Sequence, residues 1–184
     1  MLPEVRTLLQ RAAAHRFALD GLLDAIPESY WERAAPGDAW NARNHLQHLA
    51  TVEAILAQDL ERVIDGANDL WLGGSPDAVL FHERRAAMME AVADLPCAAL
   101  RGEMAANRHD AVNTLGALTA YHMEAGLRIP GVVDRWAQPV RYSLREYLTA
   151  WPNHDTAHDA AIRAAVSTPP DLSAVALTRR HRSQ

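Results

Sequence analysis

The sequence predicts an all-α fold, most simply a four-helix bundle with an extra helical insert. Apolar side chains recur at helical spacing over most of the 184 residues, and no segment keeps the two-residue alternation of a half-buried strand. Glycine and proline residues divide the chain into pieces of ordinary helix length. We therefore expect one helical domain over residues 1–167, long enough to bury a core, and a loosely ordered tail over residues 168–184.

The first two helices are indicated by residues 3–25 and by the stretch that follows Trp40. Residues 3–25 repeat apolar side chains on one face, and Pro27 ends this helix. Asn41 is a suitable N-cap for the second helix, because its side chain can accept a hydrogen bond from a free backbone N–H. The second helix is expected to reach about Asp65, after which a glycine provides a stop.

The middle of the chain predicts a third helix and a long insert. Residues 67–78 contain glycines and a proline and are expected to form a loop. Residues 77–94 are expected to form the third helix. Residues 97–128 are expected to be helical in one or two pieces, with a break near residues 107–110 or around Gly116.

The last helix is predicted to open with a capping box. Ser143 and Glu146 have the spacing at which each side chain caps a backbone N–H of the other residue. Residues 129–140, which precede it, are expected to form a loop. The helix is expected to extend to about Val166.

The composition excludes several classes of protein. A net charge of −5 and a pI near 6.0 argue against a nucleic-acid-binding surface. Cys97 is the only cysteine, so neither a disulfide framework nor a thiolate metal site is expected. No apolar run reaches the length of a membrane helix, and the N-terminus lacks a signal pattern. We expect a cytoplasmic protein that binds neither nucleic acid nor a membrane.

Three histidines form the most informative pattern in the sequence. His154 and His158 are four residues apart, which places both imidazoles on one face of the last helix. His48 shares the inward face of the second helix with apolar side chains and would supply a third ligand. Three histidines with a vacant fourth position are typical of a catalytic zinc site. We predict a divalent metal ion here, zinc by default, with nickel, iron and manganese as alternatives because imidazole discriminates weakly among them.

Aromatic and acidic side chains near these histidines have two interpretations each. Tyr147 and Trp151 precede His154 by seven and three residues, so they share its helix face and either pack in the core or line a pocket beside the metal. A neutral histidine ligand is usually oriented through its second nitrogen. The acidic residues that are candidates for this role are Glu53, Asp59, Asp155 and Asp159.

The other histidines and several arginines have simpler interpretations. His45 is interpreted as a helix-surface or pocket residue, with metal ligation as the alternative. His122 is interpreted as solvated, with a place over the pocket as the alternative. The remaining residues interpreted as solvated are His82, His109, Arg84, Arg85 and residues 179–182.

Two segments resemble the DinB/YfiT-like superfamily of metalloenzymes. Residues 26–53, IPESYWERAAPGDAWNARNHLQHLATVE, resemble that family's Pro-Gly-x-x-Trp approach, capped helix and His-Leu-Ala-x-x-Glu segment. Residues 142–163, YSLREYLTAWPNHDTAHDAAIR, resemble its His-Asp-x-x-His ending. The chain departs from the family in a longer insert over residues 97–138. It departs also in Pro152, which lies inside the ligand helix and can tilt the two histidines relative to each other.

The resemblance implies a four-helix bundle with up-down-down-up connectivity and a metal site made of His48, His154 and His158. It also implies a function, because characterised relatives include thiol-dependent isomerases and S-transferases. We therefore expect a thiol-dependent S-transferase or a hydrolase that activates a low-molecular-weight thiol or water and acts on a small molecule. A homodimer is compatible with this expectation. The alternative is a non-catalytic, stress- or damage-inducible metal-binding protein.

Overall fold

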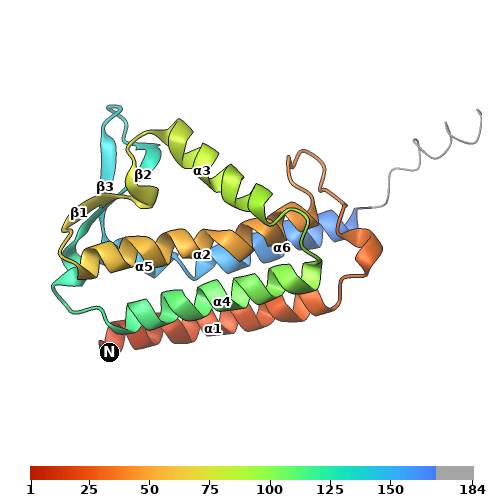
Figure 1. The fold of residues 1–184 in the computed structure, drawn as a ribbon, viewed down its shortest axis with the longest axis horizontal. Coiled ribbons are helices and arrows are strands. Elements are labelled where there is room, and N and C mark those ends of the chain that lie inside the picture. Colours follow the sequence, from red (N-terminus) through yellow and green to blue (C-terminus); the bar gives the residue numbers. More distant parts are fainter. Residues whose placement is uncertain (169–184) are drawn as a thin grey trace, which may run out of the picture.

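Four long helical segments lie side by side in the computed structural model, which describes residues 1–168 (Figure 1). They are α1 (Pro3–Asp24), α2 (Ala42–Ile64), α4 (Cys97–Gly116) and the C-terminal pair α5 (Leu144–Ala150) and α6 (Asn153–Ser167). In Figure 1, α1 and the C-terminal pair run in one direction, and α2 and α4 run in the opposite one. The tail predicted for residues 168–184 lies outside the described residues, apart from Thr168.

The start of α2 is fixed at Asn41, the predicted N-cap, which forms a capping box with Asn44. The Asn41 side chain accepts a hydrogen bond from the backbone N–H of Asn44 at 2.8 Å, and the Asn44 side chain accepts one from the Asn41 N–H at 3.1 Å. These bonds satisfy backbone groups that a helix N-terminus otherwise leaves free. The helix that carries His45 and His48 therefore begins at a defined residue.

The prediction of an all-α fold is wrong in one respect, because the structure contains a small three-stranded sheet. Strand β2 (Gly126–Val133) lies between β1 (Asp69–Trp71), which is parallel to it, and β3 (Pro139–Ser143), which is antiparallel. The strands lie in segments that were expected to be a loop, the end of a helix and a second loop. They are short and β2 contains a register shift, so their local sequence carries no clear two-residue period.

Helix α4 is unbroken from Cys97 to Gly116, so the predicted break near residues 107–110 is wrong. The alternative position, around Gly116, is where the helix ends; a short 3-10 helix, η3 (His122–Glu124), then leads into β2. Tertiary packing accounts for the continuity, since Met104 and Ala111 on the same helix are both buried.

Helix α3 (Ala78–Ala91) crosses the outside of the bundle and packs against α2 and β2 (Figure 1). It begins at Asp77, whose carboxylate accepts hydrogen bonds from the N–H groups of Val79 and Leu80. None of the residues of α3 is buried. The apolar pattern that predicts this helix therefore does not place it in the core.

The predicted last helix is divided into α5 and α6 at Pro152. Ser143 and Glu146 form the predicted capping box at the start of α5. Proline has no N–H to donate to the carbonyl four residues earlier, which interrupts the hydrogen-bond ladder. Trp151 and Pro152 nevertheless keep helical backbone angles, so the interruption is short. Both histidines of the predicted pair lie beyond it in α6.

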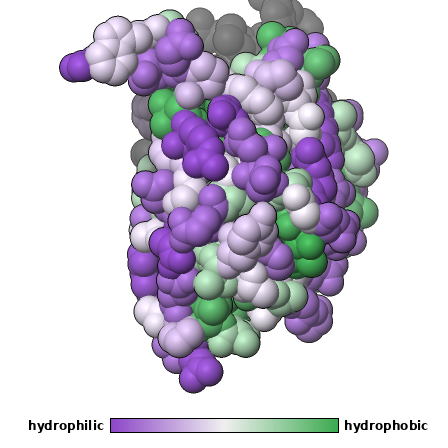
Figure 2. All heavy atoms as spheres, turned by 90° about the vertical axis from the view of Figure 1, so that its left-hand side faces the viewer, coloured by the Kyte–Doolittle hydropathy of each residue, from purple (hydrophilic) through white to green (hydrophobic). Residues whose placement is uncertain are grey.

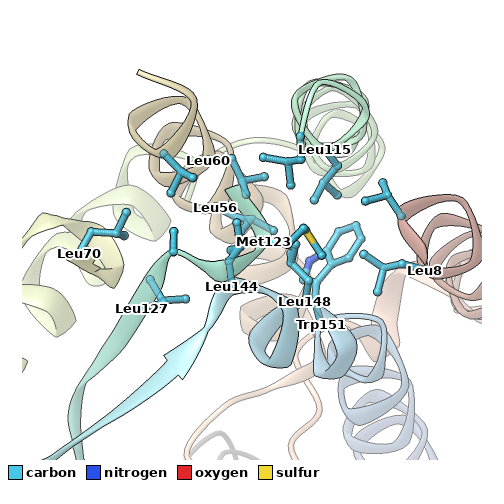
Figure 3. Close-up of a cluster of buried hydrophobic side chains, with 14 of the residues drawn as sticks. Leu8, Leu56, Leu60, Leu70, Leu115, Met123, Leu127, Leu144, Leu148 and Trp151 are labelled. Carbon is cyan, nitrogen blue, oxygen red and sulfur yellow. The ribbon is translucent and has the colours of Figure 1, made fainter. Parts of the chain in front are cut away.

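The hydrophobic core consists of two clusters. One lies toward the sheet and joins α1, α2, α4, α5 and the strands (Figure 3). Its side chains in Figure 3 include Leu8, Leu56, Leu60, Leu70, Leu115, Met123, Leu127, Leu144, Leu148 and Trp151. The other, toward the opposite end of the bundle, includes Leu19, Leu46, Leu49, Leu100 and Ile162.

The surface at the sheet end of the molecule is mixed. Figure 2 shows hydrophilic residues over most of this face, with hydrophobic residues in small groups between them. Among residues 1–168, no helix has the length and apolar character needed to span a bilayer.

Candidate metal centre

His48 on α2 and His154 and His158 on α6 converge at one point in the bundle. Their ligand atoms all lie within 4.8 Å of one another. The Nε2 atom of His154 lies 3.1 Å from Nε2 of His48 and 3.2 Å from Nε2 of His158. The structure therefore brings together the three histidines that the sequence singles out, from two helices that are about a hundred residues apart in the chain.

The nitrogen spacing fits a divalent metal ion better than it fits hydrogen bonding. A ring nitrogen carries either one proton or one lone pair, so Nε2 of His154 can form only one of its two short contacts as a good hydrogen bond. Nitrogens bound tetrahedrally to zinc at 2.0–2.1 Å would lie roughly 3.3 Å apart. The observed spacings are close to this value, so these three histidines can hold a metal ion.

Electrostatics keeps the three rings neutral, which is the state that binds a metal. Burial, with contributions from His154 and His158, lowers the pKa of His48 to about 2. Burial, with contributions from His154 and His45, lowers the pKa of His158 to about 3. Burial also lowers the pKa of His154, although Asp155 opposes this change. At neutral pH each ring therefore offers a lone pair.

Asp38 and His45 form a hydrogen-bonded chain behind His158. Nδ1 of His45 lies 3.0 Å from Nδ1 of His158, and Nε2 of His45 lies 3.2 Å from Oδ2 of Asp38. When His158 keeps its Nε2 lone pair for a metal, its proton is on Nδ1 and is donated to His45, which donates in turn to Asp38. His45 is therefore a buried partner of His158 rather than the surface or pocket residue the sequence suggests.

Trp40 covers the histidines on the side of the loop that precedes α2. Its ring centroid lies 5.3 Å from that of His45, 5.2 Å from that of His48 and 6.3 Å from that of His158. The backbone N–H of Trp40 donates to Asp38 at 2.9 Å. One loop thus supplies both the aromatic cover and the carboxylate behind His45.

Replacing His45 with leucine is expected to weaken divalent-metal binding by about 10–100-fold, because His158 loses the partner that fixes its tautomer and orientation. His45→Gln should retain part of the affinity, because an amide can both accept from His158 and donate to Asp38. The dissociation constant can be measured by competition with a chromophoric chelator. His82→Leu, on the exposed side of α3, is the control; equal affinity in His45→Leu and the control would contradict the role.

A buried ion-pair network joins all four helical segments next to the histidines. Arg16 on α1 donates two hydrogen bonds to Asp155 on α6, at 3.0 and 2.9 Å. Arg108 on α4 donates to Glu53 on α2 at 2.7 Å and to Asp155 at 2.8 Å. Each of the two carboxylate side chains is 2% exposed, so neither is free to act as an independent base.

This network corrects the roles predicted for the acidic residues. Glu53 and Asp155 bind arginines, Asp59 accepts from the Gly73 N–H and from Arg62, and Asp159 pairs with Arg163. Within residues 1–168, none of these four carboxylates accepts a hydrogen bond from His48, His154 or His158. His45 orients His158 instead.

A cavity of about 490 Å³ lies beside His154. Tyr147 and Trp151 line it, together with Glu53 and apolar side chains of α2 such as Leu56. The guanidinium carbon of Arg108 lies 4.5 Å from the centre of the Trp151 ring, on which it can stack. Trp151 is also a member of the buried cluster in Figure 3, and Tyr147 packs against that cluster. Each of the two residues therefore both packs against the core and lines the cavity.

His82, His109 and His122 lie away from the site. His82 and His109 are exposed, as expected for solvated residues. His122 lies against a separate hollow formed with Asp69 and Arg141, so its alternative placement over the pocket is wrong. Residues 179–182 of the predicted basic tail lie outside the described residues.

Comparison with known proteins identifies the fold. No protein-family model matches the chain, and no curated protein matches it in sequence. Among solved structures, the mycothiol-dependent maleylpyruvate isomerase is similar, with a TM-score of 0.63 and 14% identity. A histidine-to-alanine variant of that isomerase gives 0.62 and 16%. Each match covers 88% of this chain but 61% of the solved chain, so this chain spans about three fifths of that enzyme's length. At these identities, the likeness shows that the chain shares the fold of the matched part of the mycothiol-dependent maleylpyruvate isomerase.

Proposed function

We propose that this chain is a divalent-metal-dependent enzyme that transfers a low-molecular-weight thiol to, or from, a small molecule. The observation that carries the proposal is the convergence of three neutral Nε2 atoms beside an apolar cavity. His48, His154 and His158 would hold the ion, with zinc as the proposed metal. The shared fold supports the thiol, because the similar solved enzyme is described as mycothiol-dependent. Hydrolysis by the same site is the nearest alternative reaction.

The donor set determines what chemistry a bound ion contributes. Three neutral imidazoles cancel none of its charge, and each of them stays neutral because burial disfavours its protonation. When bound, a divalent ion lowers the pKa of a coordinated thiol or water, so that a nucleophile is available near neutral pH. The protein's own contribution is to position the reactants and to move protons.

Tyr147 is suited to donating a hydrogen bond inside the cavity. Burial, with smaller contributions from Asp59 and Glu53, raises the pKa of its phenol to about 12. The phenol therefore stays protonated at neutral pH and can stabilise negative charge that develops on a substrate oxygen. Trp151 supplies an apolar wall that Arg108 holds in place. A substrate body packed against this wall would exclude water from the reacting atoms.

A thiol-transfer screen tests the proposal. Turnover should disappear when the metal is removed by a chelator and return when about one equivalent of the ion is restored. Tyr147→Phe is expected to lower kcat by about a hundredfold, because it removes the hydrogen-bond donor to the negative charge that develops on the substrate. Tyr142→Phe, on β3 at the same cavity, is the matched control and should leave kcat unchanged.

Two outcomes would decide against this function. Turnover that persists in demonstrably metal-free protein would exclude a metal-dependent reaction. Stoichiometric metal binding with neither turnover nor coordination of any thiol would favour the non-catalytic metal-binding protein.

A further inference from the structure

Arg85 on α3 places a positive charge close to the three histidines. Its guanidinium carbon lies 5.7 Å from the centre of the Trp40 ring, and that ring lies 5.2 Å from the ring of His48. The Trp40 ring also lies 5.3 Å from that of His45 and 6.3 Å from that of His158. Arg85 therefore lies beside the aromatic ring that covers the candidate metal centre.

Arg85 differs from its neighbour Arg84 in having no partner of its own. Arg84 donates to the Gly73 carbonyl and to the Gln58 side chain, each at 2.6 Å. Over residues 1–168, Arg85 has neither a carboxylate within ion-pair distance nor a hydrogen bond, and its guanidinium lies near the face of Trp40. A guanidinium presents a planar set of donors that matches a carboxylate.

The cavity beside His154 offers no free cation to an anionic ligand. None of its lining residues within 1–168 is a lysine or an arginine, and Arg108, which stacks on Trp151, is already paired with Glu53 and Asp155. An anionic group in this cavity would lose its hydration without gaining a free partner, which is unfavourable. A ligand with one anionic end is therefore directed to place that end near Arg85 and its apolar body in the cavity.

We propose that Arg85 binds a carboxylate of the small molecule that occupies the site, an inference that rests on the proposed metal-dependent function. The ligand class is an amphiphilic small molecule with a carboxylate at the α3 side and an uncharged, apolar portion against Tyr147 and Trp151. Arg85 is then a specificity-determining residue. Under this proposal, Arg85 binds the ligand and is not only the solvated charge that the sequence suggests.

The experiment uses cobalt(II)-loaded full-length protein, in which thiolate binding produces a charge-transfer absorption band. Dissociation constants are measured for N-acetyl-L-cysteine and for its neutral amide, and their ratio is compared among wild type, Arg85→Gln and Arg84→Gln. The preference for the acid is expected to fall about fivefold in Arg85→Gln, as for loss of one charge-assisted contact, and to be unchanged in Arg84→Gln. Arg85→Lys should retain part of the preference.

A second pair of probes locates the carboxylate. 3-Phenylpropionate and 3-phenylpropionamide are used as competitors against the bound cysteine amide. An Arg85-dependent ratio in this pair supports the proposal with the carboxylate on the substrate, whereas an Arg85-dependent ratio in the cysteine pair alone supports it with the carboxylate on the thiol. If the cobalt-loaded protein shows the thiolate band but Arg85→Gln changes the acid-to-amide ratio in neither pair, this inference is overturned and the proposed function is not. Absence of cobalt binding in the wild type would overturn the proposed function and this inference with it.

Discussion

Replacing His158 with alanine is expected to remove most of the bound divalent metal while the far-UV helical signal is retained. Loss of one of three ligands should weaken binding by at least about a hundredfold, since loss of an outer partner alone costs up to about that factor. His158 is also hydrogen-bonded to His45, which is hydrogen-bonded to Asp38. The substitution therefore removes a ligand and also breaks the hydrogen-bonded chain that orients it. Metal content of the purified protein and competition titration give the measurement.

An exposed histidine provides the control for this result. His109→Ala, on the outer side of α4, should retain the full metal content. His48→Ala should behave like His158→Ala, because each substitution removes one of the three proposed ligands. The two histidines come from different helices, and the Nε2 atom of each lies next to Nε2 of His154. Unchanged metal content in both His48→Ala and His158→Ala would exclude this site.

Replacing Asp155 with alanine is expected to destabilise the metal-free protein by about 3–5 kcal/mol, because it leaves buried arginines without their carboxylate. Asp155 accepts hydrogen bonds from Arg16 and Arg108 and is 2% exposed. Glu53 already forms ion pairs with both Arg108 and Arg16, the latter at 3.5 Å, so it cannot also provide the three hydrogen bonds that Asp155 accepts from these arginines. Urea denaturation in the presence of a chelator measures this effect without a contribution from metal binding.

Asp159 offers a matched control one turn further along α6. It pairs with Arg163, whose side chain is 56% exposed, so Asp159→Ala should change the free energy of unfolding by less than about 1 kcal/mol. Equal destabilisation by the two substitutions would mean that the network contributes through helix propensity or local packing and not through its buried charges.

The helices were predictable where local chemistry determines them. Asn41 and the pair Ser143 and Glu146 are capping residues whose effect depends on their immediate neighbours, and all three act as the sequence indicates. The sheet was not predictable in this way. Strand β1 has three residues and gains its hydrogen bonds from β2, more than fifty positions later in the chain. Such pairing is set by the assembled bundle rather than by the local pattern.

The residues of the site also differ in whether local sequence or the tertiary arrangement determines their position. Histidines four residues apart on a helix face one way whatever surrounds them, which made His154 and His158 visible in the sequence. Arg85 was not, because its position depends on how α3 crosses the bundle. Arg16 carried a usable signal: it lies four residues after Ala12 and three before Leu19, on the buried face of α1. A charged residue at such a core position indicates a buried partner.

The exterior position of α3 allows ligand preference and folding stability to depend on different helices. Since no residue of this helix is buried, substitutions on it leave the packing of the other helices intact. The histidines, by contrast, belong to α2 and α6, where a change disturbs the interior. Ligand preference can therefore be altered through α3 with little loss of stability, and related chains with different substrates are expected to diverge most on this helix while the bundle beneath it stays the same.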